Sequence, residues 1–293
     1  MPDLLALTLT LKPLPGAAGT PAPRWWGRAI HALWLDVIAQ MEPALAQAIH
    51  DGSELRPYTL SSLMGRFPNG RIAGEEPYRL RITTLTSEMS DLLVRAVSMG
   101  PLVPGGPPVN LDYHGFRITA VDDGEGPWTG QADYAVLAAD ALARKHRPSR
   151  RLPLLFSSPT SFRSRKRFVP VPLPELVFGS LLKRWNAFAP VAFPEEAKRY
   201  AEACLAIARY ELRTRTVPMK AGGKRPGAVG RVTYSTLNYD RYWMGVMETL
   251  AAFARFAGVG AGVTLGMGQC RLDTSIDAKN AHPYVLSALD KEV

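Results

Sequence analysis

The amino-acid sequence predicts an α+β protein in which helices pack against antiparallel sheets. Hydrophobic residues make up 46% of the 293 residues, as in globular proteins, so the chain is long enough for two domains with separate cores. Apolar residues recur with a period of two in some segments and near 3.6 in others, which indicates alternating strands and helices. In the first part of the chain these segments follow the order β-α-β-β-α-β, the signature of a ferredoxin-like fold.

The first domain is predicted to span residues 1–125. Leucines at every second position from Leu5 to Leu11 predict a half-buried strand. From Arg28 to Met41 apolar residues recur at helical spacing, and Pro43 fits the first position of a second, short helix. The remaining predicted elements are strands at 58–63 and 78–85, a helix at 87–98 with Ser87 as N-cap, and a strand at 116–121.

The second domain is predicted to span residues 126–293. Its predicted elements are a helix at 133–144, a strand at 152–157, helices at 173–188 and 195–210, a basic hairpin tip at 220–230, a strand at 230–238, a helix at 242–256 and a strand at 267–272. This order again indicates an antiparallel sheet with helices, although no repeat is visible as sequence identity. The predicted fold is therefore two tandem ferredoxin-like (RRM-like) βαββαβ domains with antiparallel sheets. The pattern predicts no role for residues 273–293.

Five glycines fall within residues 258–268, here called the glycine segment: Gly258, Gly260, Gly262, Gly266 and Gly268. Glycine lets backbone N–H groups approach a ligand closely, and successive N–H groups can form a phosphate-binding concavity. The spacing differs from G-x-G-x-x-G, and the segment lacks the lysine of a P-loop, which excludes both nucleotide-cofactor motifs. A mobile linker is the alternative, but apolar residues alternate with the glycines, which is unusual for linkers.

Positive charge is concentrated in one part of the chain. The net charge is +9, but residues 144–231 hold 20 Lys/Arg and 5 Asp/Glu, a net +15, which leaves −6 for the remainder. Such a field suits a polyanion such as nucleic acid. A solvated basic surface or an acidic protein partner remains an alternative.

The histidines and cysteines do not have the spacing of metal ligands. None of the five histidines forms an H-x-x-x-H pair, and Cys204 and Cys270 make neither a metal motif nor a disulfide framework, so we expect no metal and no cofactor. The N-terminus lacks a signal peptide, and no apolar run is long enough for a membrane span, so we expect a cytoplasmic protein without a membrane partner. His31 lies at the edge of the apolar face of its predicted helix. His50 ends the second helix, where an imidazole interacts favourably with the helix dipole.

Six segments of the chain match one known family in order: residues 27–33, 43–51, 56–61, 156–162, 174–188 and 258–268. Together they resemble the CRISPR-associated endoribonucleases that process precursor CRISPR RNA, the Cas-six family of the RAMP superfamily. The resemblance spans about residues 4–272 and agrees with the predicted pair of ferredoxin-like domains.

The resemblance implies a metal-independent endoribonuclease. In this family the ribose 2′-oxygen attacks the adjacent phosphate within the repeat, which leaves a 2′,3′-cyclic phosphate, and the product can stay bound. An imidazole suits the proton transfers. His31 is then the leading catalytic candidate, His50 matches a second family histidine, and Arg56 stands where some members have a catalytic lysine. Some members also use a tyrosine in the first helix, but Trp34 and Leu35 stand there, which favours a histidine-centred site.

The resemblance also assigns the basic residues to RNA binding. Beside the glycine segment, the candidate phosphate contacts are Arg163, Arg165, Lys166, Arg167, Lys220, Lys224, Arg225 and Arg231. The implied partners are precursor CRISPR RNA and Cascade-type CRISPR effector subunits, and a homodimer is one candidate oligomeric state. Two alternative functions stay open: a catalytically inactive RNA-binding subunit of a CRISPR effector complex, and a phosphate-binding metabolic enzyme.

Overall fold

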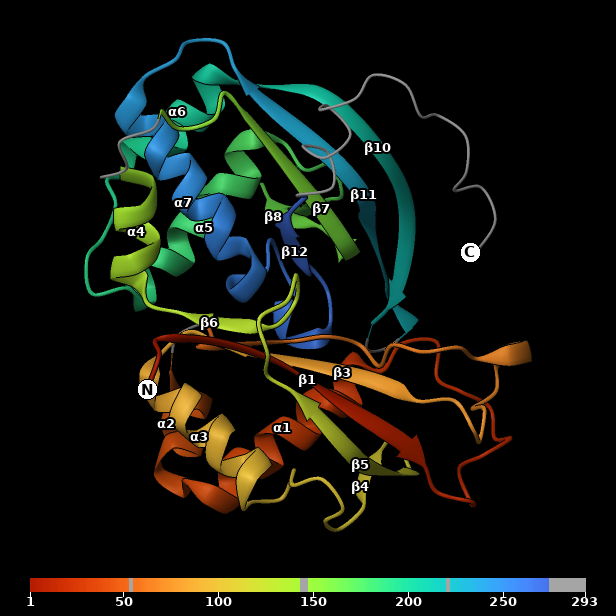
Figure 1. Ribbon diagram of the computed structural model, residues 1–293. Helices are drawn as coiled ribbons and strands as arrows, with labels where there is room; N and C mark the ends of the chain where they lie inside the picture. The colour runs from red at the N-terminus through yellow and green to blue at the C-terminus, as the bar shows by residue number, and fades with distance from the viewer. Residues whose placement is uncertain (53–54, 143–146, 220–221, 274–293) are drawn as a thin grey trace.

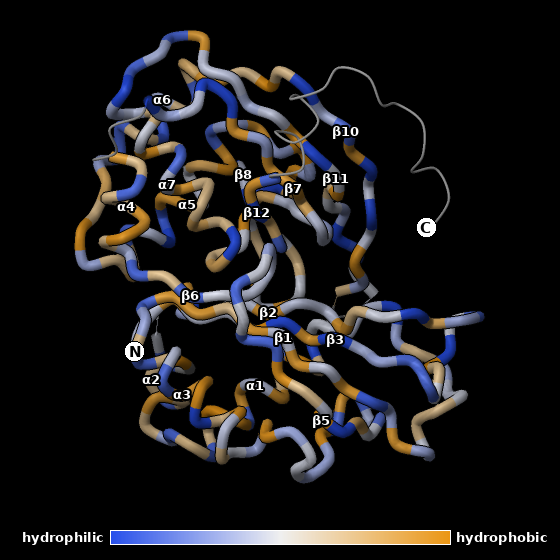
Figure 2. Tube along the Cα trace, viewed as in Figure 1, coloured by the Kyte–Doolittle hydropathy of each residue, from blue (hydrophilic) through white to orange (hydrophobic). Residues whose placement is uncertain are grey.

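The computed structural model describes residues 1–52, 55–142, 147–219 and 222–273. Two halves lie one above the other, each with a sheet and its own helices (Figure 1). Buried hydrophobic residues form two large clusters, one in each half, and the cluster of the second half also includes Leu4, Ala6 and Leu85 of the first half. Hydrophobic residues gather inside both halves, whereas the outer strand β10 is largely hydrophilic (Figure 2).

The first half has one antiparallel sheet, with strands of different lengths and helices on one face. Its elements are β1 (Leu4–Pro13), α1 (Gly27–Met41), α2 (Pro43–Asp51), β2 (Tyr58–Leu60), β3 (Tyr78–Thr84), α3 (Ser87–Ser98), β4 (Val109–Leu111), β5 (His114–Asp122) and β6 (Gly130–Ala132). The strand order is β2-β3-β1-β5-β4, and β6 also pairs with β1. Helix α1 buries Ile30, Trp34 and Val37 at the predicted helical spacing. The N-cap of α3 is Thr86 rather than the predicted Ser87, because the Thr86 side chain accepts a hydrogen bond from the Met89 N–H.

The second half repeats this arrangement. Its elements are α4 (Tyr134–Leu142), β7 (Arg151–Thr160), β8 (Phe162–Ser164), β9 (Arg167–Val169), α5 (Pro174–Phe188), α6 (Glu196–Cys204), β10 (Leu205–Pro218), β11 (Lys224–Thr236), α7 (Arg241–Ala257) and β12 (Cys270–Leu272). The sheet order is β10-β11-β7-β12, and β8 and β9 form a separate hairpin. Without the short strands β4 and β6, each half has a sheet of four strands. In both sheets the first and third strands along the chain lie in the centre, as in a ferredoxin-like fold. The predicted tandem ferredoxin-like fold is therefore confirmed.

Two predicted elements of the second half were wrong. The predicted helix at 195–210 ends at Cys204, and the following residues form β10, which pairs with β11 along its length. The predicted hairpin tip at 220–230 is strand from Lys224 onward, although it contains Pro226, Gly227 and Gly230. Long-range pairing overrides local propensity here, and a register shift in the pairing with β7 accommodates the glycines.

A buried arginine joins the two halves. Arg81 of β3 donates from Nε to the Trp128 carbonyl at 2.5 Å, from Nη1 to the Gln269 side-chain oxygen at 2.7 Å, and from Nη2 to the Arg255 carbonyl. Burial lowers the pKa of Arg81 to about 9, so the group is still charged at neutral pH. The predicted boundary between the two domains, after residue 125, lies before β6. Because β6 pairs with β1 of the first half, the chain passes to the second half only after β6.

Among the helices of the described residues, none combines the length and the apolar character that a bilayer crossing requires.

Candidate active site

Helix α1 and strand β2 bring a histidine and a tyrosine together. The His31 Nε2 atom lies 3.1 Å from the Tyr58 hydroxyl oxygen, which is hydrogen-bond distance. Tyr58 is fully buried, and the ring of Trp34 packs edge-on against it with the centroids 6.1 Å apart. This packing fixes the tyrosine, so its hydroxyl holds the imidazole of His31 in one orientation.

The charge states of this pair follow from burial and from Arg56. Burial, and then the nearby positive charge of Arg56, lower the pKa of His31, so its imidazole is mostly neutral at pH 7. Burial raises the pKa of Tyr58 to about 12, with a smaller opposing effect of Arg56, so the hydroxyl keeps its proton. We call His31, Arg56 and Tyr58 the histidine cluster. It offers a neutral base beside a permanent cation.

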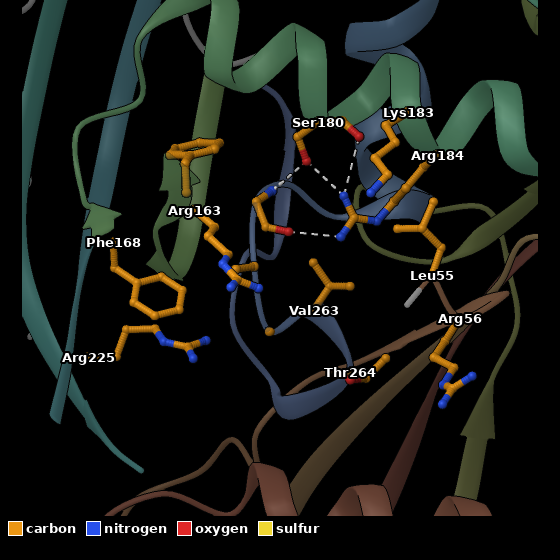
Figure 3. A pocket seen from close by; sticks show the side chains of 14 residues that line it. Leu55, Arg56, Arg163, Phe168, Ser180, Lys183, Arg184, Arg225, Val263 and Thr264 are labelled. Carbon is orange, nitrogen blue, oxygen red and sulfur yellow. Dashed lines mark hydrogen bonds between the residues drawn. The ribbon is translucent and has the colours of Figure 1, made fainter. Parts of the chain in front are cut away.

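Next to the histidine cluster lies a cavity of about 420 Å³, here called the basic cavity (Figure 3). Both halves of the protein contribute to its wall. Five of its lining side chains carry positive charge, and none of the 14 lining residues is an Asp or Glu. The lining residues are Leu55, Arg56, Phe162, Arg163, Phe168, Ser180, Lys183, Arg184, Arg225, Gly260, Ala261, Gly262, Val263 and Thr264.

Arg184 of α5 is the most buried of the charged side chains in this wall. Its guanidinium donates to the Ser180 hydroxyl at 2.7 Å, to the Ser180 carbonyl at 3.3 Å and to the Gly260 carbonyl at 2.8 Å. Burial lowers the pKa of Arg184 to about 10, so it remains a cation at neutral pH. Its three hydrogen bonds go to neutral oxygens, which do not offset its charge.

Arg225 of β11 lies against Phe168 of β9. The guanidinium carbon of Arg225 is 3.9 Å from the ring centroid, a cation–π stack. The Arg225 Nε atom is buried and has no hydrogen-bond partner in the described structure. Burial lowers the pKa of Arg225 as well.

The β8–β9 hairpin carries predicted phosphate contacts to the rim of the basic cavity. Arg163 lines the cavity, and Arg165 and Lys166 form the two-residue turn. Both turn residues have positive φ, 46° for Arg165 and 65° for Lys166, as a type I′ turn requires. Their side chains and that of Arg167 are exposed, so the hairpin presents its charges to solvent.

Other predicted contacts lie elsewhere. Lys224 is exposed at the start of β11. The Arg231 Nε atom lies 2.7 Å from a carboxylate oxygen of the buried Asp273, which offsets its charge. His50 lies in the last turn of α2, one residue before the helix ends at Asp51, but its side chain lies outside the described structure, and so does Lys220.

The glycine segment packs between the two halves. All five glycines have positive φ. A Cβ on Gly260 would lie 2.4 Å from the Ser161 carbonyl oxygen, and one on Gly266 would lie 2.6 Å from the Ser62 nitrogen. The N–H groups of residues 258–261 and 268 donate to oxygens of the protein. The segment is therefore a packing element that also forms one wall of the basic cavity.

Sequence reasoning missed several side chains of this site. Tyr58 stands two residues after Arg56, but it was predicted only as part of a strand. Phe168, Ser180, Lys183 and Arg184 are ordinary residues of a hairpin and a helix, and no local pattern marks them. The i, i+4 spacing of Ser180 and Arg184 was the one available signal. Among the described residues no group of three His, Cys, Asp or Glu is arranged to hold a metal ion.

Comparison with known proteins gives one consistent family. A family model described as "CRISPR-associated endoribonuclease Cas6" matches residues 154–270. A curated "CRISPR-associated endoribonuclease Cas6" of Mycobacterium tuberculosis is 26% identical over 194 residues, which are 66% of this chain. This match spans 58% of the length of that relative.

Solved structures extend the similarity to nearly the whole chain. The product complex of the Cas6 protein TTHB231 from Thermus thermophilus is 26% identical, with a TM-score of 0.76, and the match covers 93% of this chain and 100% of that one. The product complex of the Cas6 protein TTHA0078 is 27% identical with a TM-score of 0.74, covering 92% and 99%. The TTHA0078 protein is also found in a complex with a substrate mimic.

Proposed function

We propose that the chain, which is similar to CRISPR-associated Cas6 endoribonucleases, acts as they do and cleaves precursor CRISPR RNA within its repeats. The cleavage needs no metal ion and leaves a 2′,3′-cyclic phosphate. The observation that carries the proposal is the histidine cluster, in which a mostly neutral imidazole stands beside a cation and next to a basic cavity.

His31 acts as the base in this mechanism. It takes the proton of the ribose 2′-hydroxyl while the 2′-oxygen attacks phosphorus and the bond from phosphorus to the 5′-oxygen breaks. An acid returns a proton to the 5′-oxygen, and His50 remains the candidate for this step. Arg56 stabilises the negative charge of the phosphorane. Tyr58 orients the His31 ring through its hydroxyl.

Binding of the RNA is assigned to the basic rim. The exposed cations of the β8–β9 hairpin and Lys224 contact phosphates, which sets affinity and salt sensitivity without reading sequence. Lys220 and the glycine segment remain candidate contacts, and Arg231 contributes less because Asp273 offsets its charge. Relatives of this chain are found in complexes with their products, which supports retention of the cleaved RNA.

The test is single-turnover cleavage of the cognate CRISPR repeat RNA in EDTA. His31→Ala should slow cleavage by a factor on the order of 10²–10⁴, the usual contribution of one acid–base group, with RNA binding unchanged. His114→Ala is the matched control, because His114 is a half-buried histidine of β5 that bonds Thr20 and does not line the cavity.

Two outcomes would change the proposal. Near-normal cutting by His31→Ala, together with loss of cutting by His50→Ala, would assign the base to His50. Normal RNA binding by the parent protein without cleavage under any condition would favour a non-catalytic RNA-binding subunit of a CRISPR effector.

A further inference from the structure

We propose that the basic cavity binds one unpaired nucleotide, with its phosphate against Arg184 and Lys183 and its base against Phe168. The nucleotide belongs to the RNA substrate, so this inference rests on the proposed function and deepens it.

The positive charge of the cavity favours the binding of an anion. Arg184 is 7% exposed, and no carboxylate pairs with it among the described residues. A buried charge without a counter-charge is unfavourable, and a phosphate oxygen beside the guanidinium offsets that cost with charge-assisted hydrogen bonds. Lys183, one residue before Arg184 on α5, turns its ammonium group toward the same space (Figure 3).

The opposite side of the cavity suits a flat, apolar group. Phe168 is 40% exposed although it lines the cavity, and the stack of its ring with Arg225 makes a planar surface. Nucleic-acid bases stack on aromatic rings and guanidinium planes. A Cβ on Gly262 would lie 3.2 Å from the Arg225 Nη1 atom, so the glycine permits this close arrangement.

The size of the cavity limits what enters it. A volume of about 420 Å³ falls in the usual range of small-ligand sites, about 300–1,000 Å³. A single nucleotide is a ligand of this class, whereas a duplex is not, so the bound nucleotide is unpaired. Unpaired RNA bases are splayed out and stacked in this way by many proteins.

The position of the cavity gives the bound nucleotide a place in the reaction. Arg56 lines the cavity and also lowers the pKa of His31. The nucleotide in the cavity therefore sits beside the proposed cleavage site. It fixes the register of the RNA strand with respect to His31.

The experiment is isothermal titration calorimetry of the full-length protein with AMP, adenosine and inorganic phosphate. We expect AMP to bind at one site, about tenfold more tightly than phosphate, because base stacking adds to the phosphate contacts. Adenosine should bind more weakly than AMP. Saturating repeat RNA should abolish AMP binding, since both occupy the cavity. AMP binding that persists in saturating RNA would overturn the assignment to RNA and point to a free nucleotide.

Variants separate the two sides of the cavity. Phe168→Ala should reduce AMP affinity to that of phosphate and leave phosphate binding unchanged, whereas Lys183→Ala should weaken both ligands. Arg209→Ala is the matched control, because it removes an exposed positive charge on β10 outside the cavity. Equal affinities for AMP and phosphate in the parent protein would overturn the base-stacking side. Absence of saturable binding would overturn the site.

The outcome is independent of cleavage. His31→Ala should bind AMP like the parent protein even where it no longer cuts RNA. A protein that binds AMP competitively with RNA but never cleaves would refute the proposed function and leave the nucleotide site standing.

Discussion

Replacing Arg81 by methionine should destabilise the protein by about 2–4 kcal/mol. The guanidinium makes three hydrogen bonds that join β3 of the first half to Trp128, Gln269 and Arg255. Hydrogen bonds from a charged donor contribute about 1.5–3 kcal/mol each before other effects are counted. Removing the charge also relieves its burial, which is worth several kcal/mol in the opposite direction. Methionine keeps an unbranched apolar side chain in the junction, so the packing loss is small.

Differential scanning calorimetry of both proteins measures the effect. For a chain of this size one kcal/mol corresponds to roughly 2–4 °C in Tm, so the melting temperature should fall by about 4–16 °C. Arg79→Met is the control, because Arg79 lies two residues earlier on the same face of β3 but is exposed, and it should change stability by less than about 0.5 kcal/mol. A Tm for Arg81→Met equal to that of the parent would refute the reasoning that these bonds outweigh the burial of the charge.

Three further predictions address the site and the core. Arg56→Gln removes a cation that lowers the pKa of His31, so that pKa should rise and the acidic limb of the cleavage pH profile should move to higher pH. An unmoved limb would contradict His31 as the base. Arg165→Ala should reduce the slope of log binding constant against log salt by about 0.7, measured by filter binding, and an unchanged slope would mean that the hairpin tip does not contact phosphate. Burial raises the pKa of Cys270, so iodoacetamide should alkylate it far more slowly than the half-buried Cys204 in the native protein, as peptide mass spectrometry reports. Equal rates would contradict this.

Elements with a clear hydrophobic period could be predicted from the sequence. The alternating leucines predicted β1, and the helical spacing after Arg28 predicted α1, because these apolar residues face the core of their own half. The β10–β11 hairpin could not be predicted, because its strands contain helix-favouring alanines and loop-favouring glycines. Pairing between residues far apart in sequence determined the structure there.

The same limit applies to the site. The family resemblance pointed to His31 and Arg56, which the structure brings near each other. Tyr58 reaches His31 across 27 positions, and Arg184 reaches Gly260 across 76, so no short motif could reveal either contact. The basic cavity exists only because two halves of the chain fold against each other, and its walls have no signature within any one segment.

In the turn of the β8–β9 hairpin, the residues that would give the highest thermal stability differ from those that would bind a polyanion best. Arg165 and Lys166 occupy left-handed backbone conformations, which cost roughly 1–2 kcal/mol per residue for side chains of this kind. Asn–Gly is the pair that such a turn favours, but it carries no charge. In a library randomised at these two positions, a screen for heat resistance alone should therefore enrich variants with Asn–Gly. The same library should keep basic residues when screened for RNA retention.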